Sequence, residues 1–202
     1  LCSISTLEQR ISGGTRPAIA FLAPYPSEEF LRDGYYKRIR NIDDLFSTDY
    51  FRIYVSQYDN LISEPQVIEQ NEHSVEILFN VVNEYHLRKI AKIVNKCAFL
   101  YTHSVLRINT LLLDQIHIPK ILDVHGSVPE EAHLYKNLEG QRIYEEWEKY
   151  AVSTFDAFVC VTDAMRAHLE HKYTISLPKS IVLPTYDQGV FQYIMQEFKV
   201  PK

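Results

Sequence analysis

The stretch Lys120-Ile-Leu-Asp-Val-His-Gly-Ser-Val-Pro-Glu-Glu131 joins a short apolar run to the start of a helix. The run over 120–124 is typical of a strand that is buried on both faces of a parallel sheet. Ser127 is followed by Pro129 and Glu130, which is the pattern of a capping box at a helix N-terminus. This stretch therefore predicts a strand, a short His-Gly loop and a helix, the unit from which α/β folds are built.

The same alternation continues on both sides of this stretch. Short apolar runs are followed by segments whose apolar residues recur at helical spacing. The other predicted strands are 18–23, 51–55, 75–79, 98–101, 157–161 and 180–183, with 67–68 as a short candidate. The predicted helices are 35–46, 84–96, 106–115, a segment over 127–155 interrupted at Gly140, and one capped by Thr162. We expect a Rossmann-like parallel β-sheet flanked by helices on both faces.

The length of 202 residues fits one domain with one sizeable core. We place this domain at 17–188. Residues 1–16 are polar and read as a leader or tail, and 189–202 as the start of an interdomain linker or a terminal helix.

Composition excludes several classes of protein. A net charge of -5 argues against nucleic acid as the main partner. The cysteines, Cys2, Cys97 and Cys160, are far apart, and the last two lie in apolar runs. This usage favours the cytoplasm over a secreted setting. No apolar run approaches the ~20 residues that span a bilayer, so the remaining membrane role is a peripheral one at its inner face.

Chemistry is expected at the carboxyl ends of the strands, where parallel α/β sheets bind ligands. Small polar residues and histidines gather there, and capping of the next helix is the commoner role for Ser, Thr or Asp at such positions. A cap does not need an imidazole, so His125 stands out, although a histidine satisfied by backbone carbonyls remains an alternative. The strand ends read Pro24-Tyr25-Pro26, Thr102-His103-Ser104, His125-Gly126-Ser127, Thr162-Asp163 and Thr185-Tyr186-Asp187.

Other motifs are weak or absent. Gly34 follows the first strand and opens a helix, the position of many phosphate-binding loops, but neither GxGxxG nor GxxxxGK[ST] is present. The histidines and cysteines lack metal-ligand spacing, so we expect no metal. Two basic clusters, one around Arg38 and one around Lys92, are more typical of solvated helix faces than of sites for phosphate or anionic lipid.

Three segments carry a resemblance to a known family. They are Ile121-Leu-Asp-Val-His-Gly-Ser-Val-Pro-Glu-Glu131, Phe158-Val-Cys-Val-Thr-Asp-Ala-Met165 and Ile181-Val-Leu-Pro-Thr185. In this order, and with Asp33-Gly34-Tyr35 after the first strand, the chain resembles the N-terminal domain of GT-B glycosyltransferases, particularly family 4. The resemblance implies a two-domain enzyme in which this half binds a sugar or lipid-linked acceptor and a missing half binds the nucleotide-sugar.

The resemblance also implies roles for particular residues. The glycine loop of the family approaches the donor diphosphate or the acceptor, and its strand-end histidine faces the transferred sugar, so we carry these roles onto Gly34 and His125. The usual Gly-Gly pair is here Asp33-Gly34. We predict His125 as catalytic, and no resident cofactor beyond the nucleoside-diphosphate sugar substrate. The predicted substrate-binding residues are Asp33, Gly34, Tyr35, Lys37, His103, Gly126, Ser127 and Thr162.

Two other classes of function stay open. A non-catalytic accessory or regulatory module could keep this fold without the reaction. A nucleotide-dependent oxidoreductase is disfavoured by the missing glycine fingerprint.

Overall fold

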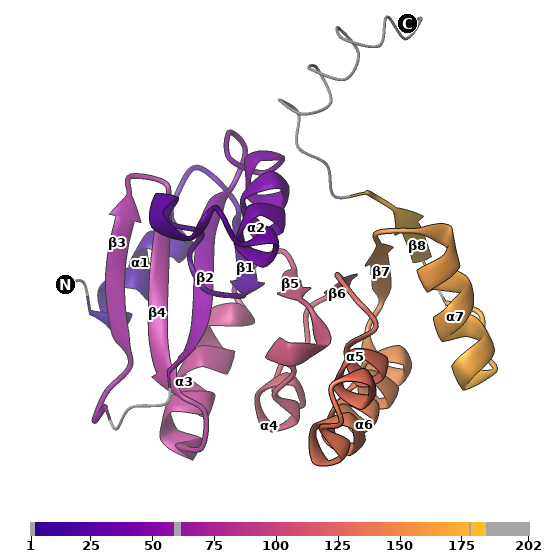
Figure 1. Cartoon of the computed structure of the whole chain (residues 1–202). Coiled ribbons are helices and arrows are strands. Elements are labelled where there is room, and N and C mark those ends of the chain that lie inside the picture. Colours follow the sequence, from indigo (N-terminus) through magenta and orange to yellow (C-terminus); the bar gives the residue numbers. More distant parts are fainter. Residues whose placement is uncertain (1–2, 59–61, 178, 185–202) are drawn as a thin grey trace, which may run out of the picture.

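An eight-stranded sheet crosses the described part of this computed structural model, residues 3–58, 62–177 and 179–184 (Figure 1). Its strands are β1 Ala18–Leu22, β2 Phe51–Tyr58, β3 Gln66–Asn71, β4 Ser74–Asn80, β5 Leu100–His103, β6 Lys120–Val124, β7 Ala157–Cys160 and β8 Lys179–Val182. Their order across the sheet is β3-β4-β2-β1-β5-β6-β7-β8. Every neighbouring pair is parallel except β3 with β4, which confirms the predicted fold class.

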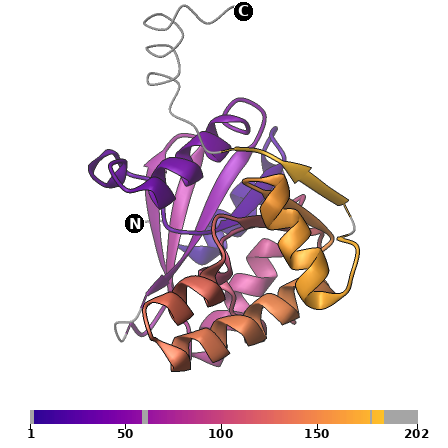
Figure 2. The ribbon, with the colours of Figure 1, turned by 45° about the vertical axis from the view of Figure 1, so that its right-hand side comes forward.

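Helices cover both faces of the sheet (Figures 1 and 2). They are α1 Ile4–Gly13, α2 Gly34–Asp44, α3 Glu84–Val94, α4 Thr110–Leu113, α5 Val128–Leu134, α6 Leu138–Thr154 and α7 Asp163–Tyr173, with 3-10 turns η1 Glu28–Phe30 and η2 Val105–Arg107. The larger core holds buried side chains of α1, α3, α4, α6 and α7. The smaller core, on the other face, is formed by α2 through Ile39 and Ile42. None of the helices in the described ranges is long and apolar enough to cross a membrane.

The first strand shows why its sequence is a continuous apolar run. Ala20 and Leu22 point into the larger core, whereas Ile19 and Phe21 point into the smaller one. All five residues of β1 are buried. Since successive side chains of a strand alternate between faces, a strand covered on both sides needs apolar residues at every position.

The edge at β3 departs from the expected parallel pattern. The short candidate at 67–68 is a full strand that pairs antiparallel with β4. Its tight connection is an Asx turn, in which His73 N donates to Asn71 Oδ1 at 2.9 Å. A connection this short permits only an antiparallel pair, because a parallel pair needs a long crossover.

The segment 1–16, expected as a leader or tail, contains helix α1. Ser3 caps this helix by accepting a hydrogen bond from Thr6 N at 3.1 Å. Leu7 is fully buried in the larger core, and Glu8 pairs with Lys92 of α3. The polar composition of this segment reflects its exposed side, and residues 4–13 belong to the fold.

Two predicted helices have different bounds in the structure. The helix expected over 106–115 is split into η2 and α4, because Asn109 starts a new helix by accepting from Leu112 N at 3.0 Å. The interruption expected at Gly140 lies earlier, at Lys136, where φ is 59°. Gly140 is instead in the first turn of α6, and its N–H donates to the Asn137 cap at 2.9 Å. The segment 189–202 and the strand-end triplet 185–187 lie outside the described residues.

Candidate functional site

A pocket opens at the carboxyl edge of the sheet, beside the neighbouring strands β1 and β5. Beyond β1 the chain continues to β2 on one side, and it later returns to β5 on the other. This reversal of strand order is where open α/β sheets bind their ligands. The pocket has a volume of about 370 Å³ and is lined by Gly34 and Tyr35 of α2, Ser104 after β5, and His125 and Gly126 after β6.

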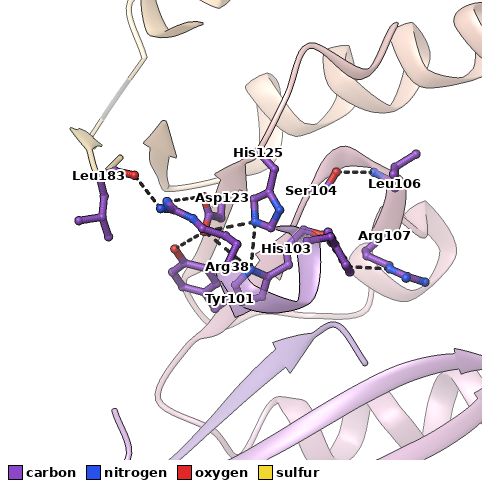
Figure 3. A network of polar contacts seen from close by, with 10 residues as sticks. Arg38, Tyr101, His103, Ser104, Leu106, Arg107, Asp123, His125 and Leu183 are labelled. Carbon is purple, nitrogen blue, oxygen red and sulfur yellow. Dashed lines mark hydrogen bonds and ion pairs between the residues drawn. The ribbon is translucent and has the colours of Figure 1, made fainter. Parts of the chain in front are cut away.

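His125 contributes an imidazole ring to this pocket (Figure 3). Its Nε2 lies 3.4 Å from Asp123 Oδ2 and 3.1 Å from His103 Nδ1. Its Nδ1 is shielded from solvent and has no hydrogen-bond partner among the described residues. The Tyr35 ring packs against it with 5.3 Å between centroids. One nitrogen is therefore held from inside the domain, and the other is buried without a partner among the described residues.

Asp123 lies under His125 and is the centre of a buried polar network. Arg38 donates to both carboxylate oxygens, from Nε to Oδ2 at 3.0 Å and from Nη2 to Oδ1 at 2.9 Å. The Tyr101 hydroxyl donates to Oδ2 at 3.0 Å. Arg38 also donates to the Leu183 carbonyl at 2.7 Å, just after β8. The side chains of Arg38 and Asp123 are 3% and 0% exposed, so solvent screens this ion pair little.

The network sets the charges at the site. Burial alone would raise the pKa of Asp123, but the hydrogen bond and charge of His125, together with the hydrogen bond from Arg38, outweigh burial and lower it. Burial, and then the charge of His125, hold the pKa of His103 well below its ordinary value. Burial and the Asp123 charge raise the pKa of Tyr101. Asp123 is therefore ionised and His103 neutral near pH 7.

Tyr35 closes the other side of the pocket. Its hydroxyl donates to the His103 carbonyl at 3.3 Å and accepts from Arg107 Nε at 2.9 Å. Ser104, at the end of β5, has φ 71° and accepts a hydrogen bond from Leu106 N at 3.3 Å. A non-glycine residue in this left-handed region carries backbone strain, which is frequent where a loop is shaped for binding.

The three side chains His103, Asp123 and His125 converge closely enough to be tested as a metal site, with ligand atoms within 4.8 Å of one another. They do not fit a cation well. The carboxylate already receives Arg38 and Tyr101, and a divalent ion would add positive charge beside a buried guanidinium. The cluster fits a network that orients His125 better than a metal centre.

Four of the predicted site residues come together in this pocket: Gly34, Tyr35, His125 and Gly126. Gly34 opens α2, and no heavy atom lies within 4 Å of a Cβ built on it, so the space in front of it is open. Gly126 does not have a positive φ. A side chain at Gly126 would instead meet the Glu131 carboxylate.

The remaining predicted residues have other places. Asp33 caps α2 by accepting from Tyr35 N at 2.8 Å, and Thr162 caps α7 by accepting from Met165 N at 3.1 Å. His103 is fully buried and acts through the network rather than lining the pocket. Lys37 lines a separate hollow with Leu183 and Pro184.

The capping box predicted at Ser127 is wrong. Ser127 is the residue before α5, but its side chain makes no capping hydrogen bond. Glu130, which should have reached back to it, accepts from Lys172 at 2.7 Å and lies 3.1 Å from His168 Nε2. An ion pair between α5 and α7 therefore takes the carboxylate that the local pattern assigned to the helix start.

The main residues that sequence reasoning missed are Arg38, Tyr101 and Asp123. Arg38 was placed on a solvated basic face, yet only 2% of its surface is exposed. A signal was present, because Tyr35, Arg38 and Ile42 share the spacing of the apolar stripe of α2. The other basic cluster is a surface one, since Lys92 pairs with Glu8 and Lys89 with Glu64.

The comparison with protein families decides the identity of the chain. The model of Glycosyltransferase Family 4 matches residues 70–185, which is more than half of the sequence. The chain belongs to glycosyltransferase family 4. No curated protein matches its sequence.

Solved structures of low sequence identity share the fold of this family 4 domain. Sucrose-phosphate synthase from Thermosynechococcus elongatus aligns with a TM-score of 0.62 and 12% identity over 92% of this chain and 53% of its own. A second structure of that enzyme has a TM-score of 0.52 and 11% identity, covering 90% of this chain and 97% of its own. An E. coli trehalose-6-phosphate structure bound with UDP-2-fluoro glucose has a TM-score of 0.50 and 9% identity over 91% and 51%. This chain therefore spans about half the length of the first sucrose-phosphate synthase chain and about half that of the E. coli chain.

Proposed function

We propose that this glycosyltransferase module is the acceptor-side domain of an enzyme that transfers a hexose from a nucleotide-sugar. The observation that carries the proposal is the pocket at the carboxyl edge, which is lined by both Gly34 and His125, an imidazole whose shielded Nδ1 has no partner among the described residues. Buried polar atoms in proteins are normally hydrogen-bonded, so an orphan nitrogen in a pocket favours a ligand or water there. Sugars offer many hydroxyl groups for such a contact.

In this proposal His125 contacts the transferred sugar, and the N-terminus of α2 at Gly34 lies close to the donor diphosphate or the acceptor. A hydrogen bond that strengthens as charge develops in the transition state lowers the barrier. In this reaction the nucleoside diphosphate departs and the configuration at the sugar carbon is retained. The departing diphosphate takes the proton of the acceptor hydroxyl. His125 then serves as a hydrogen-bonding contact rather than as a general base.

The acceptor is proposed to be a glycan, a polysaccharide or a lipid-linked sugar, and the setting to be the cytoplasm or the inner face of the membrane. One structure with the same fold is named sucrose-phosphate synthase, and another is bound with UDP-2-fluoro glucose. This supports a sugar chemistry without naming the acceptor. We propose no resident metal or cofactor.

The test uses the protein at its full encoded length. The protein is incubated with UDP-, GDP- and ADP-sugars and with mono- and oligosaccharide acceptors, and release of nucleoside diphosphate is followed. The proposal expects release that depends on one nucleotide-sugar and increases with an acceptor. Absence of release with every donor, together with absence of sugar binding, would favour a non-catalytic accessory module.

A further inference from the structure

We propose that Asp123, clamped by Arg38, is a positioning residue that holds the neutral His125 imidazole with its proton on Nε2. The unprotonated Nδ1 is then a hydrogen-bond acceptor, and a ligand group that reaches it from the pocket is a donor such as a sugar hydroxyl. The position of the His125 proton is a property of this chain alone. The choice of a sugar hydroxyl as the ligand group rests on the proposed function.

The Asp123 carboxylate lies next to the Nε2 side of the His125 ring. Asp123 Oδ2 lies 3.4 Å from His125 Nε2, and the carboxylate is ionised. A bare Nε2 would direct its lone pair at this oxygen, whereas a protonated Nε2 donates to it. His103 Nδ1, 3.1 Å away, then accepts from the same N–H, which places the His103 proton on its own Nε2, an atom without a partner among the described residues. The reverse arrangement, with His103 donating, would leave two lone pairs facing each other across the 3.4 Å distance.

The Asp123 side chain is held in one orientation by its hydrogen-bond donors. Arg38 donates to both of its oxygens in a planar fork, and Tyr101 adds a third donor at Oδ2. Forked pairs of this kind fix geometry as well as adding energy. Three donors from α2 and β5 thus fix the plane of the carboxylate, and with it the position of the negatively charged Oδ2 that His125 Nε2 faces.

The other ring nitrogen of His125, Nδ1, differs from Nε2 in its hydrogen bonding. His125 Nδ1 has no partner in the described part of the chain and is shielded from bulk water. Figure 3 shows the His125 ring with Asp123 to its left, His103 below it and Ser104 to its right, and Ser104 lines the same pocket. A carboxylate that anchors one imidazole nitrogen so that the other meets the substrate is a recurrent way to fix the tautomer.

The test is long-range proton–nitrogen NMR on the uniformly nitrogen-15-labelled chain of 202 residues, without ligand. Spectra are recorded at about pH 8, above the ordinary histidine pKa of about 6.5. The His125 signals are assigned by their loss in His125→Gln. The inference expects a protonated Nε2 and a pyridine-type Nδ1. A protonated Nδ1 on His125 overturns it.

Two variants separate positioning from general stability. In Asp123→Asn the carboxylate charge is lost, and we expect the Nε2 proton to exchange with water at least ~10-fold faster or to move to Nδ1, because charge-assisted hydrogen bonds are about twice as strong as neutral ones. The matched control is Asp43→Asn. Asp43 is a buried partner of Arg52 at 2.6 Å on the same face of the sheet, away from His125. The control should leave the His125 signals as in the wild type.

The outcomes distinguish this inference from the proposed function. A protonated Nε2 that is lost in Asp123→Asn and kept in Asp43→Asn supports the positioning role, even if no sugar binds. Equal exchange in the wild type and Asp123→Asn overturns the role, even if the full-length protein transfers a sugar. If Asp123→Asn does not fold, the wild-type tautomer still decides the central statement.

Discussion

Arg38 and Asp123, 85 residues apart in the sequence, form a two-pronged ion pair with contacts of 3.0 and 2.9 Å. The pair joins α2 to β6 beneath the loop that carries His125. Because neither side chain is exposed to an appreciable extent, each charge depends on the other for solvation. The candidate site is thus built on an electrostatic contact inside the domain.

Replacement of Arg38 by Met should lower the free energy of unfolding by about 3–5 kcal/mol, because it leaves a buried carboxylate without its counter-ion. Urea denaturation measures this. The control is Arg40→Met, which removes a pair with an exposed Glu28 and should cost about 0–1 kcal/mol. Equal costs for the two variants would contradict a structural role for the buried pair.

His103 should make the domain less stable as the pH falls. The folded state holds its pKa below the ordinary value of about 6.5, mainly through burial. The unfolded chain therefore binds a proton that the folded chain does not, and stability is lost below about pH 6.5 by up to about 1.4 kcal/mol per pH unit. Urea denaturation between pH 7 and 5 should give a shallower pH dependence for His103→Phe than for the wild type. His171→Gln, at an exposed position, should keep the wild-type slope; identical slopes for all three proteins would refute the prediction.

Helix α1 should contribute to the stability of the domain. Leu7→Ala removes a fully buried side chain and should cost about 2–5 kcal/mol in chemical denaturation. Leu134→Ala, at a site 75% exposed, should change stability by no more than about 0.5 kcal/mol. A Leu7→Ala variant as stable as the control would mean that α1 does not pack on the core.

Gly34→Ala should lower kcat/KM without lowering the stability of the fold. The added methyl group enters open space, so stability should stay the same or rise by up to about 1 kcal/mol as glycine is removed from a helix. If the loop approaches substrate, kcat/KM of the full-length protein should fall by ~10-fold or more. Gly13→Ala, also into open space, serves as the control and should leave kcat/KM unchanged. Wild-type kinetics in Gly34→Ala would mean that Gly34 only begins helix α2 and does not approach substrate.

Much of the fold could be predicted because its signals are local. The apolar run of β1 and the amphipathic period of α3 each reflect how a single element is buried. The antiparallel strand β3 was underestimated because an edge strand is only half covered, which leaves a weak alternating pattern. The break expected at Gly140 lies at Lys136 instead, and α6 begins at the Asn137 cap rather than after the glycine.

The site was harder to predict because its connections are distant in the sequence. His125 and Gly34 could be found from their places after strands, since such loops converge at one edge. The pairing of Arg38 with Asp123 joins α2 to β6, and no local pattern links these residues. Lys37 and Arg38 are neighbours in a basic cluster and line the same hollow, yet only the structure shows that Arg38 is buried and paired with Asp123.

The most direct test of the central claim is the release of nucleoside diphosphate from a nucleotide-sugar by the full-length protein, comparing the wild type with His125→Ala. If His125 contacts the transferred sugar in the transition state, kcat should fall by at least ~10-fold. His133→Ala, at an exposed position on α5, should retain wild-type kcat. Unchanged kcat in His125→Ala would contradict the account and leave His125 with a structural role only.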